Sequence, residues 1–117
     1  MSRKLQNYLL SQRKRFGLTQ EETAFLLGVK SGAKVSRYER FQRLPNLKTA
    51  LALQALFGVP VADLFAGVYE QVEKETSDRA RILESKMERA TANRSNARKA
   101  ELLRAIAITP DINKENP

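Results

Sequence analysis

Two cations three residues apart, Lys34 and Arg37, are the side chains in this sequence best suited to a specific chemical task. At that spacing both lie on one face of a helix. Arginine or lysine donating to O6 and N7 of guanine is the commonest specific contact between a protein and a DNA base. We therefore expect these residues to read bases in the major groove. The alternative for each is contact with the phosphate backbone, which carries no sequence information.

The residues just before this pair offer weaker contacts. Lys30 and Ser31 are second-rank candidates for base reading, and the Ser31 hydroxyl also suits a helix N-cap. Gly32 and Ala33 have little or no side chain, so they would permit close approach of a helix to DNA. Ala33 can offer no more than a methyl contact to thymine.

The stretch 18–39 predicts two short helices joined by a tight turn. Thr19 and Glu22 form a capping box at the start of the first helix, and Gly28 marks its end. This helix-turn-helix would carry the two cations on its second helix. Apolar residues three apart give the helices matching stripes: Ala24 and Leu27, then Val35 and Tyr38.

Helical signals continue on both sides of this pair. A first helix is expected over 2–16, with Gly17 as its end. A fourth helix begins after Asn46 as N-cap and stops at Gly58, and Pro60 opens a short fifth helix. The apolar residues expected to face the core are Leu5, Tyr8, Leu9, Phe16, Leu47, Leu51, Phe57, Leu64 and Phe65.

This order of motifs resembles the Xre family of helix-turn-helix proteins, which includes the lambda-type phage repressors and Cro proteins. The resemblance implies an all-α, lambda-repressor-like five-helix DNA-binding domain, followed here by a C-terminal helical extension. It covers roughly residues 5–65. The matching positions are 18–22, Ala24, 27–29, 35–37, 39–40, Pro45, Leu47, 56–59 and 63–65.

The sequence departs from the family pattern at three places. The turn between Gly28 and Val35 is one residue longer than usual, which leaves open two registers for the reading helix, one residue apart. Phe41 stands where the family commonly has glycine, and Gln54 replaces a usual alanine. If Gln54 faced the core, its amide would need hydrogen-bond partners, since an unpaired buried amide costs about 1–3 kcal/mol. We therefore expect Gln54 to lie at a surface between subunits.

The resemblance also implies supporting roles. Gln20 corresponds to a family glutamine that touches phosphate. Arg13 and Glu39 correspond to residues that form an ion pair between the first helix and the reading helix. The alternatives are a solvent-facing glutamine and a loose surface pair contributing about 0–1 kcal/mol. The loop 41–46 could itself rest on the sugar-phosphate backbone. Its candidate backbone contacts are Arg40, Arg43, Asn46 and Lys48.

Charge and composition agree with a nucleic-acid partner. Residues 1–67 hold eleven Lys or Arg against four acids, a net charge of +7, while residues 68–117 hold ten against nine. A localised basic field attracts DNA, although a basic surface kept for solubility is the alternative. The chain has no cysteine and no histidine, which removes thiol nucleophiles, the usual zinc ligands and the commonest general base. We expect no enzymatic activity, cofactor or metal.

The second half of the chain indicates an extension. Residues 68–109 predict sparsely apolar helix, which the polar stretch 91–96 can divide in two, and 110–117 predicts a disordered tail. Such a helix is poorly stable alone, so we expect it to form a homodimer interface or to bind a protein partner. No apolar run approaches the ~18 residues of a membrane span, and the N-terminus lacks a secretory signal. A cytoplasmic location is expected.

These observations predict a sequence-specific transcription regulator of bacterial or phage origin, a repressor that binds double-stranded DNA as a homodimer. One alternative is the antitoxin of a toxin–antitoxin pair, built on the same DNA-binding core. Another is a protein-interaction module without DNA binding, which Lys34 and Arg37 on the motif face disfavour.

Overall fold

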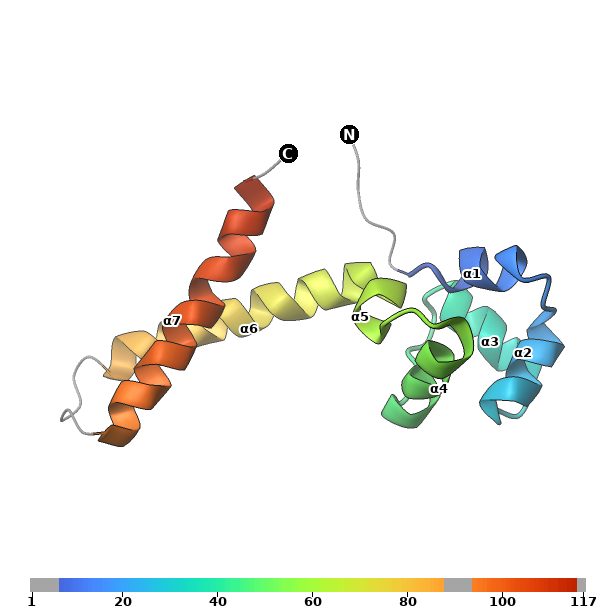
Figure 1. The fold of residues 1–117 in the computed structure, drawn as a ribbon, viewed down its shortest axis with the longest axis horizontal. Helices are drawn as coiled ribbons and strands as arrows, with labels where there is room; N and C mark the ends of the chain where they lie inside the picture. Colours follow the sequence, from blue (N-terminus) through green and yellow to red (C-terminus); the bar gives the residue numbers. More distant parts are fainter. Residues whose placement is uncertain (1–6, 88–93, 116–117) are drawn as a thin grey trace. The chain divides into compact units, whose positions relative to one another are not determined.

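The computed structural model describes the backbone of residues 7–87 and 94–115 and the side chains of 7–87 and 96–107. All regular secondary structure in these residues is helical, and the chain divides into two compact units, Met1–Tyr69 and Glu70–Pro117 (Figure 1). The helices are α1 (Leu9–Arg15), α2 (Gln20–Leu27), α3 (Gly32–Glu39), α4 (Leu47–Phe57), α5 (Val61–Leu64), α6 (Ala66–Met87) and α7 (Arg94–Glu115).

Apolar side chains from helices α1, α3, α4 and α5 meet in the core of the first unit. Leu9, Leu53 and Leu64 are completely buried, and partly buried residues of α2, such as Leu27, pack against them. The α2–α3 pair therefore rests on a scaffold of the other three helices. This arrangement confirms the predicted all-α, lambda-repressor-like architecture with C-terminal helices.

Two predicted helix starts are present in atomic detail. The Thr19 hydroxyl accepts from the Glu22 N–H at 3.0 Å, and the Glu22 carboxylate accepts from the Thr19 N–H at 2.9 Å. Asn46 caps α4, because its Oδ1 accepts from the Thr49 N–H at 2.9 Å. Each cap satisfies backbone donors that the first turn of a helix leaves free.

The first helix is shorter than predicted, since it begins at Leu9 rather than Ser2. The Tyr8 N–H donates to the Leu64 carbonyl at 2.7 Å, and the Asn7 Oδ1 accepts from the Leu9 N–H at 3.1 Å. The first bond ties Tyr8 to α5, and Asn7 and Tyr8 are both outside the helix. The expected core residue Leu5 lies outside the described residues.

The buried face of α4 also differs from the prediction. Leu47 and Leu51 are 74% and 50% exposed, whereas Ala50 and Leu53 are buried together with Phe57. Three- and four-residue spacing fits either set, and the packed helices α2 and α5 decide which face turns inward. Phe16, also expected in the core, is 56% exposed and stacks on Phe57 with ring centroids 6.0 Å apart.

Gln54 has a role within its own subunit. Its side-chain oxygen accepts from the Val61 N–H at 2.9 Å, at the first residue of α5. The amide is exposed and satisfies a free donor of the next helix. This hydrogen bond accounts for the glutamine without a contact to a second subunit.

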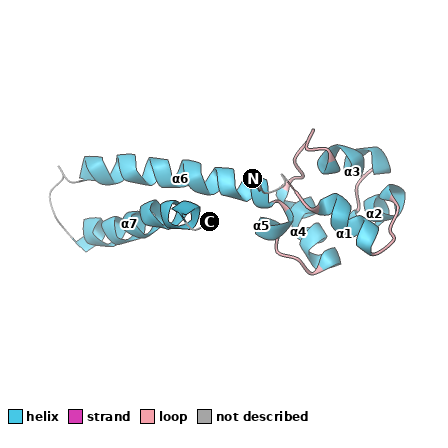
Figure 2. Ribbon diagram, turned by 90° about the horizontal axis from the view of Figure 1, so that it is seen from above, coloured by secondary structure: helices cyan, strands magenta, loops and turns pink. Residues whose placement is uncertain are grey.

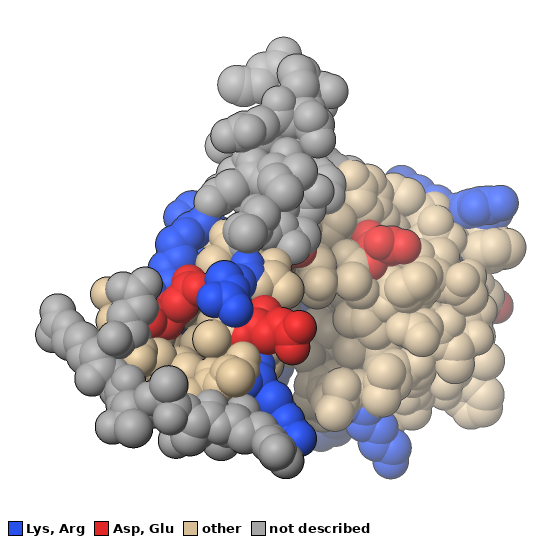
Figure 3. Space-filling view, turned by 60° about the vertical axis from the view of Figure 1, so that its left-hand side comes forward, with Lys and Arg blue, Asp and Glu red and all other residues tan. Residues whose placement is uncertain are grey.

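The second unit is built from α6, from Glu70 onward, and from α7, and the two helices lie against each other and run in opposite directions (Figure 2). Their contact buries Ser77 and Ala80 of α6 against Leu103 and Ala107 of α7. The Ala107 carbonyl accepts from the Ser77 hydroxyl at 3.1 Å and from Arg81 Nη2 at 2.8 Å. Acidic and basic side chains alternate over this unit in Figure 3. None of the described helices is both long and apolar enough to span a membrane.

The predicted disordered tail needs correction. Helix α7 continues through Pro110 to Glu115, and only the last two residues lie outside the described part of the chain. Proline is costly inside a helix because it removes a backbone hydrogen bond. The bonds to the Ala107 carbonyl hold the turn just before this proline. The predicted break at 91–96 overlaps residues 88–93, which lie between the two described helices.

Candidate nucleic-acid interface

The outward face of α3 is centred on Ala33 and Arg37. These residues are four apart, so they lie on one face of the helix, and both are exposed. The opposite face packs inward through Gly32, Val35 and Tyr38, all of which are buried. Arg37 therefore lies where the sequence indicated. Lys34 is half-buried at the flank of this face.

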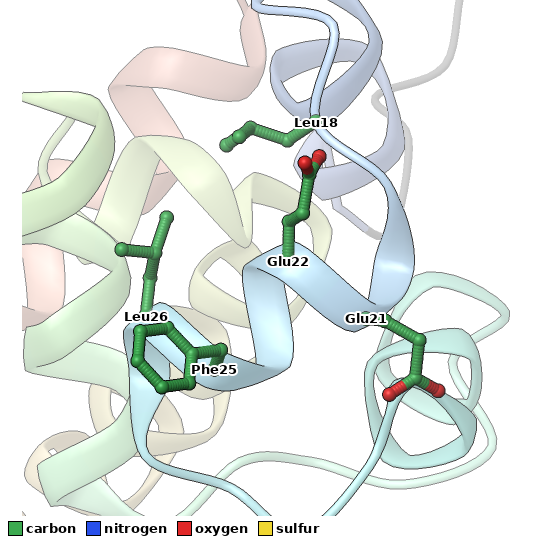
Figure 4. Close-up of a pocket in the computed structure, with 5 residues that line it drawn as sticks. All are labelled: Leu18, Glu21, Glu22, Phe25 and Leu26. Atoms are coloured by element: carbon green, nitrogen blue, oxygen red, sulfur yellow. The ribbon is translucent and has the colours of Figure 1, made fainter.

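Glu21 holds the start of α3 against α2. Its carboxylate accepts from the Gly32 N–H at 2.9 Å, and Figure 4 shows the side chain turned toward α3. A Cβ on Gly32 would lie 2.6 Å from Glu21 Oε2 and 3.1 Å from the backbone carbon of Gln20. Gly32 therefore lets the helices approach each other and does not face outward, which corrects the expectation that it lies open to DNA.

Ser31 occupies the N-cap position of α3, as predicted, but its side chain makes no capping hydrogen bond. The Glu21 carboxylate serves the Gly32 N–H instead. Sequence analysis missed this role of Glu21, because a contact between residues eleven positions apart and across a turn leaves no periodic signal.

The end of α3 is fixed by an ion pair with α1. Arg13 donates through Nε and Nη2 to the two carboxylate oxygens of Glu39, the second bond being 3.2 Å long. Arg13 Nη1 also donates to the Leu18 carbonyl at 2.9 Å. The side chains of Arg13 and Glu39 are only 12% and 4% exposed. The structure thus brings together the two residues that the family resemblance paired.

Gln20 joins the same cluster. Its Nε2 donates to Glu39 Oε1 at 3.0 Å, and the residue is half-buried. Gln20 was expected to touch phosphate. Its amide is directed to Glu39 and links the first turn of α2 to the last turn of α3.

The remaining candidate contacts lie in the segments before and after α3. Lys30 is exposed in the turn before the helix, and Arg40 and Arg43 are exposed in the loop after it. Lys48 is exposed on the first turn of α4, and Asn46 uses its side-chain oxygen as a cap. The face of the first unit visible in Figure 3 is largely uncharged, with a few acidic side chains on it and basic side chains at its edges.

The fold and this site define an all-helical DNA-binding domain with a helix-turn-helix at α2–α3. Residues 9–64 match the protein family described as Helix-turn-helix. This part of the chain is an Xre-type helix-turn-helix domain, which is the domain of a family of DNA-binding transcription regulators. No match to the chain was found among curated proteins or among solved structures.

Proposed function

We propose that the protein is a sequence-specific transcription repressor that inserts α3 into the major groove. The observation that carries the proposal is the rigid mounting of α3. Glu21 binds its first residue, and Arg13 and Gln20 bind Glu39 at its last, while Arg37 stays exposed between them. A reading helix needs this combination, because base contacts require side chains held in a fixed register.

Within this proposal, Arg37 is the main base-reading residue. Its guanidinium can donate two parallel hydrogen bonds to O6 and N7 of guanine, and Ala33 on the same face can contact a thymine methyl. Lys34 adds a cation from the flank. Lys30 and Ser31 approach from the preceding turn.

The backbone contacts would come from both ends of the motif. Arg40 and Arg43 in the loop and Lys48 on α4 are exposed and can approach phosphates, and the Asn46 amide can add a donor. This part of the chain carries a net charge of +7 over residues 1–67. Its affinity should therefore fall steeply as salt rises.

Titration of a labelled random-sequence duplex pool at increasing salt tests DNA binding directly. Each neutralised phosphate should contribute about −0.9 to the slope of log affinity against log salt. Sequence preference is tested by selecting the tightest duplexes from the same pool. Failure to bind any duplex at low salt would exclude the proposal.

We propose that the second unit joins two copies of the chain. Val72 and Leu83 are eleven residues apart in α6, hence on one face, and are 49% and 47% exposed. A second copy could cover this apolar face. Two reading helices would then meet half-sites about 34 Å apart, which raises affinity and selectivity over a single domain.

A second candidate function is protein binding, as in the antitoxin alternative. An apolar hollow on the outer face of α2 favours it, because Phe25 is 83% and Leu26 52% exposed there beside Leu18 (Figure 4). Figure 4 shows the Glu22 carboxylate beside Leu18 at the hollow, so an apolar segment with a basic residue would suit it. Co-expression of the protein with the products of its neighbouring genes tests this function. Recovery of a stable complex that is lost in the Phe25→Ala variant would support it.

The proposal includes the setting in which the protein works. A repressor of this family acts on a bacterial or phage chromosome, and therefore in the cytoplasm. Bound over a promoter, a dimer would block access of the transcription machinery. Reporter expression from the selected duplex, with and without the protein, separates repression from activation.

A further inference from the structure

Helices α1, α2 and α3 end in the same hydrogen-bond pattern. In each, a residue in the left-handed conformation donates its N–H to the carbonyl of the residue three positions earlier. The next residue donates its N–H to the carbonyl of the residue five positions before itself. The first residue is Gly17 after α1, Gly28 after α2 and Phe41 after α3. Their φ angles are 69°, 72° and 58°. In α3 the two bonds are Phe41 N–H to the Tyr38 carbonyl at 3.1 Å and Gln42 N–H to the Arg37 carbonyl at 2.8 Å.

Phenylalanine is poorly suited to this position. A left-handed conformation brings Cβ close to the following carbonyl, and glycine avoids this clash because it has no Cβ. Among the described non-glycine residues, Phe41 alone has a positive φ. The chain uses glycine at the two equivalent helix ends, so the motif itself does not require an aromatic ring.

The ring is also not a core residue. Phe41 is 40% exposed and lies outside the buried cluster formed by Leu9, Tyr38, Leu53 and their neighbours. The strain is therefore not explained by complete burial of a large apolar side chain. A backbone strain that the fold does not require suggests a functional reason for the side chain.

The position of Phe41 indicates what that reason is. The residue directly follows the proposed reading helix, and its neighbours Arg40 and Arg43 are both exposed. Gln42 N–H binds the carbonyl of Arg37, so this loop is attached to the residue at the centre of the outer face. A partly exposed ring with an exposed arginine on each side of it in the sequence suits a surface that is both anionic and partly apolar, as the sugar-phosphate backbone is.

We propose that Phe41 is a DNA contact whose ring packs on a deoxyribose of the strand that Arg40 and Arg43 hold by its phosphates. This inference rests on the proposed DNA-binding function. Removing apolar surface of the ring and the sugar from water stabilises the complex. The contact neutralises no phosphate, so it adds affinity without adding salt dependence.

The test compares the full-length protein with Phe41→Gly, Phe41→Ala and Phe41→Leu on a short duplex selected from a random-sequence pool. Glycine suits the φ of 58°, so Phe41→Gly should keep its melting temperature or raise it. Its affinity for the duplex should fall about threefold to tenfold. Phe41→Ala should lose similar affinity, and Phe41→Leu should retain most of it.

Salt dependence supplies the matched control. Phe41→Gly should leave the slope of log affinity against log salt unchanged, whereas Arg43→Ala should reduce its magnitude by about 0.9. Equal affinity of Phe41→Gly and the natural protein would overturn the proposal. So would a melting temperature that falls together with the affinity, because the ring would then be a packing residue. Absence of DNA binding by the natural protein would refute the proposed function itself, and this inference with it.

Discussion

Glu21 on α2 accepts a hydrogen bond from the backbone N–H of Gly32 on α3 at 2.9 Å, and the space above Gly32 is too small for a methyl group. The two residues together set the distance between the helices of the motif. Helix α3 is thus positioned by a carboxylate from α2 rather than by its own capping side chain.

Gly32→Ala should destabilise the protein by about 1–3 kcal/mol, because the new Cβ would displace the Glu21 carboxylate and press on Gln20. Chemical denaturation measures the change. The exposed neighbour offers a control, since Ala33→Gly should cost only about 1 kcal/mol through helix propensity. In a Glu21→Ala background the cost of Gly32→Ala should become smaller, and an unchanged cost would contradict the proposed coupling.

Arg13→Ala should destabilise the protein by about 3–5 kcal/mol, because it leaves the Glu39 carboxylate buried and paired only with Gln20. Arg13→Lys keeps the charge but cannot reproduce the two-point contact, so its loss should be intermediate. Thermal unfolding of both variants checks the order. The exposed pair Lys74–Asp78 provides the contrast, and Lys74→Ala should change stability by less than about 1 kcal/mol.

Arg37→Ala should reduce discrimination between a selected duplex and random DNA by about 1–3 kcal/mol, the amount a lost bidentate base contact removes. Arg43→Ala should weaken binding to both duplexes alike, because a phosphate contact carries no sequence information. Competition binding measures the two ratios. Equal losses for Arg37→Ala on both duplexes would show that the register of α3 in the groove is wrong.

Deleting residues 70–117 should leave a folded, monomeric domain that binds one half-site weakly. The cut follows Tyr69 because Val68 packs against the core of the first unit. In the full chain, Leu83→Arg should also dissociate the dimer, while Ile82→Arg, exposed on another side of α6, should not. Sedimentation distinguishes these states. A truncated chain that still dimerises would move the interface to the first unit, where Leu47 and Leu51 are exposed on α4.

Phe41→Gly should be more stable than Phe41→Ala by about 1 kcal/mol, because both lack the ring and only alanine is strained at this φ. The adjacent residue gives the opposite expectation. At position 42, glycine should be no more stable than alanine, since Gln42 does not have a positive φ. Denaturation midpoints of the glycine and alanine variants at positions 41 and 42 test both expectations, independently of DNA binding.

The sequence by itself determined the helices of the motif and their local limits. The Thr19–Glu22 capping box, the Asn46 cap and the stop at Gly28 depend on residues within a few positions of each other, so their chemistry can be read directly from the chain. The stripe of Val35 and Tyr38 likewise predicted which side of α3 is buried. Their spacing therefore indicated that Arg37 would face outward.

Only the tertiary structure decided which of several acceptable local patterns was used. Leu47 and Leu51 fit a core face as well as Ala50 and Leu53 do, and the packing of α4 on its neighbours chose the second pair. Ser31 has the chemistry of a cap, yet the carboxylate of Glu21 binds the start of α3. These outcomes depend on groups brought together from separate helices, and no local periodicity records such distances.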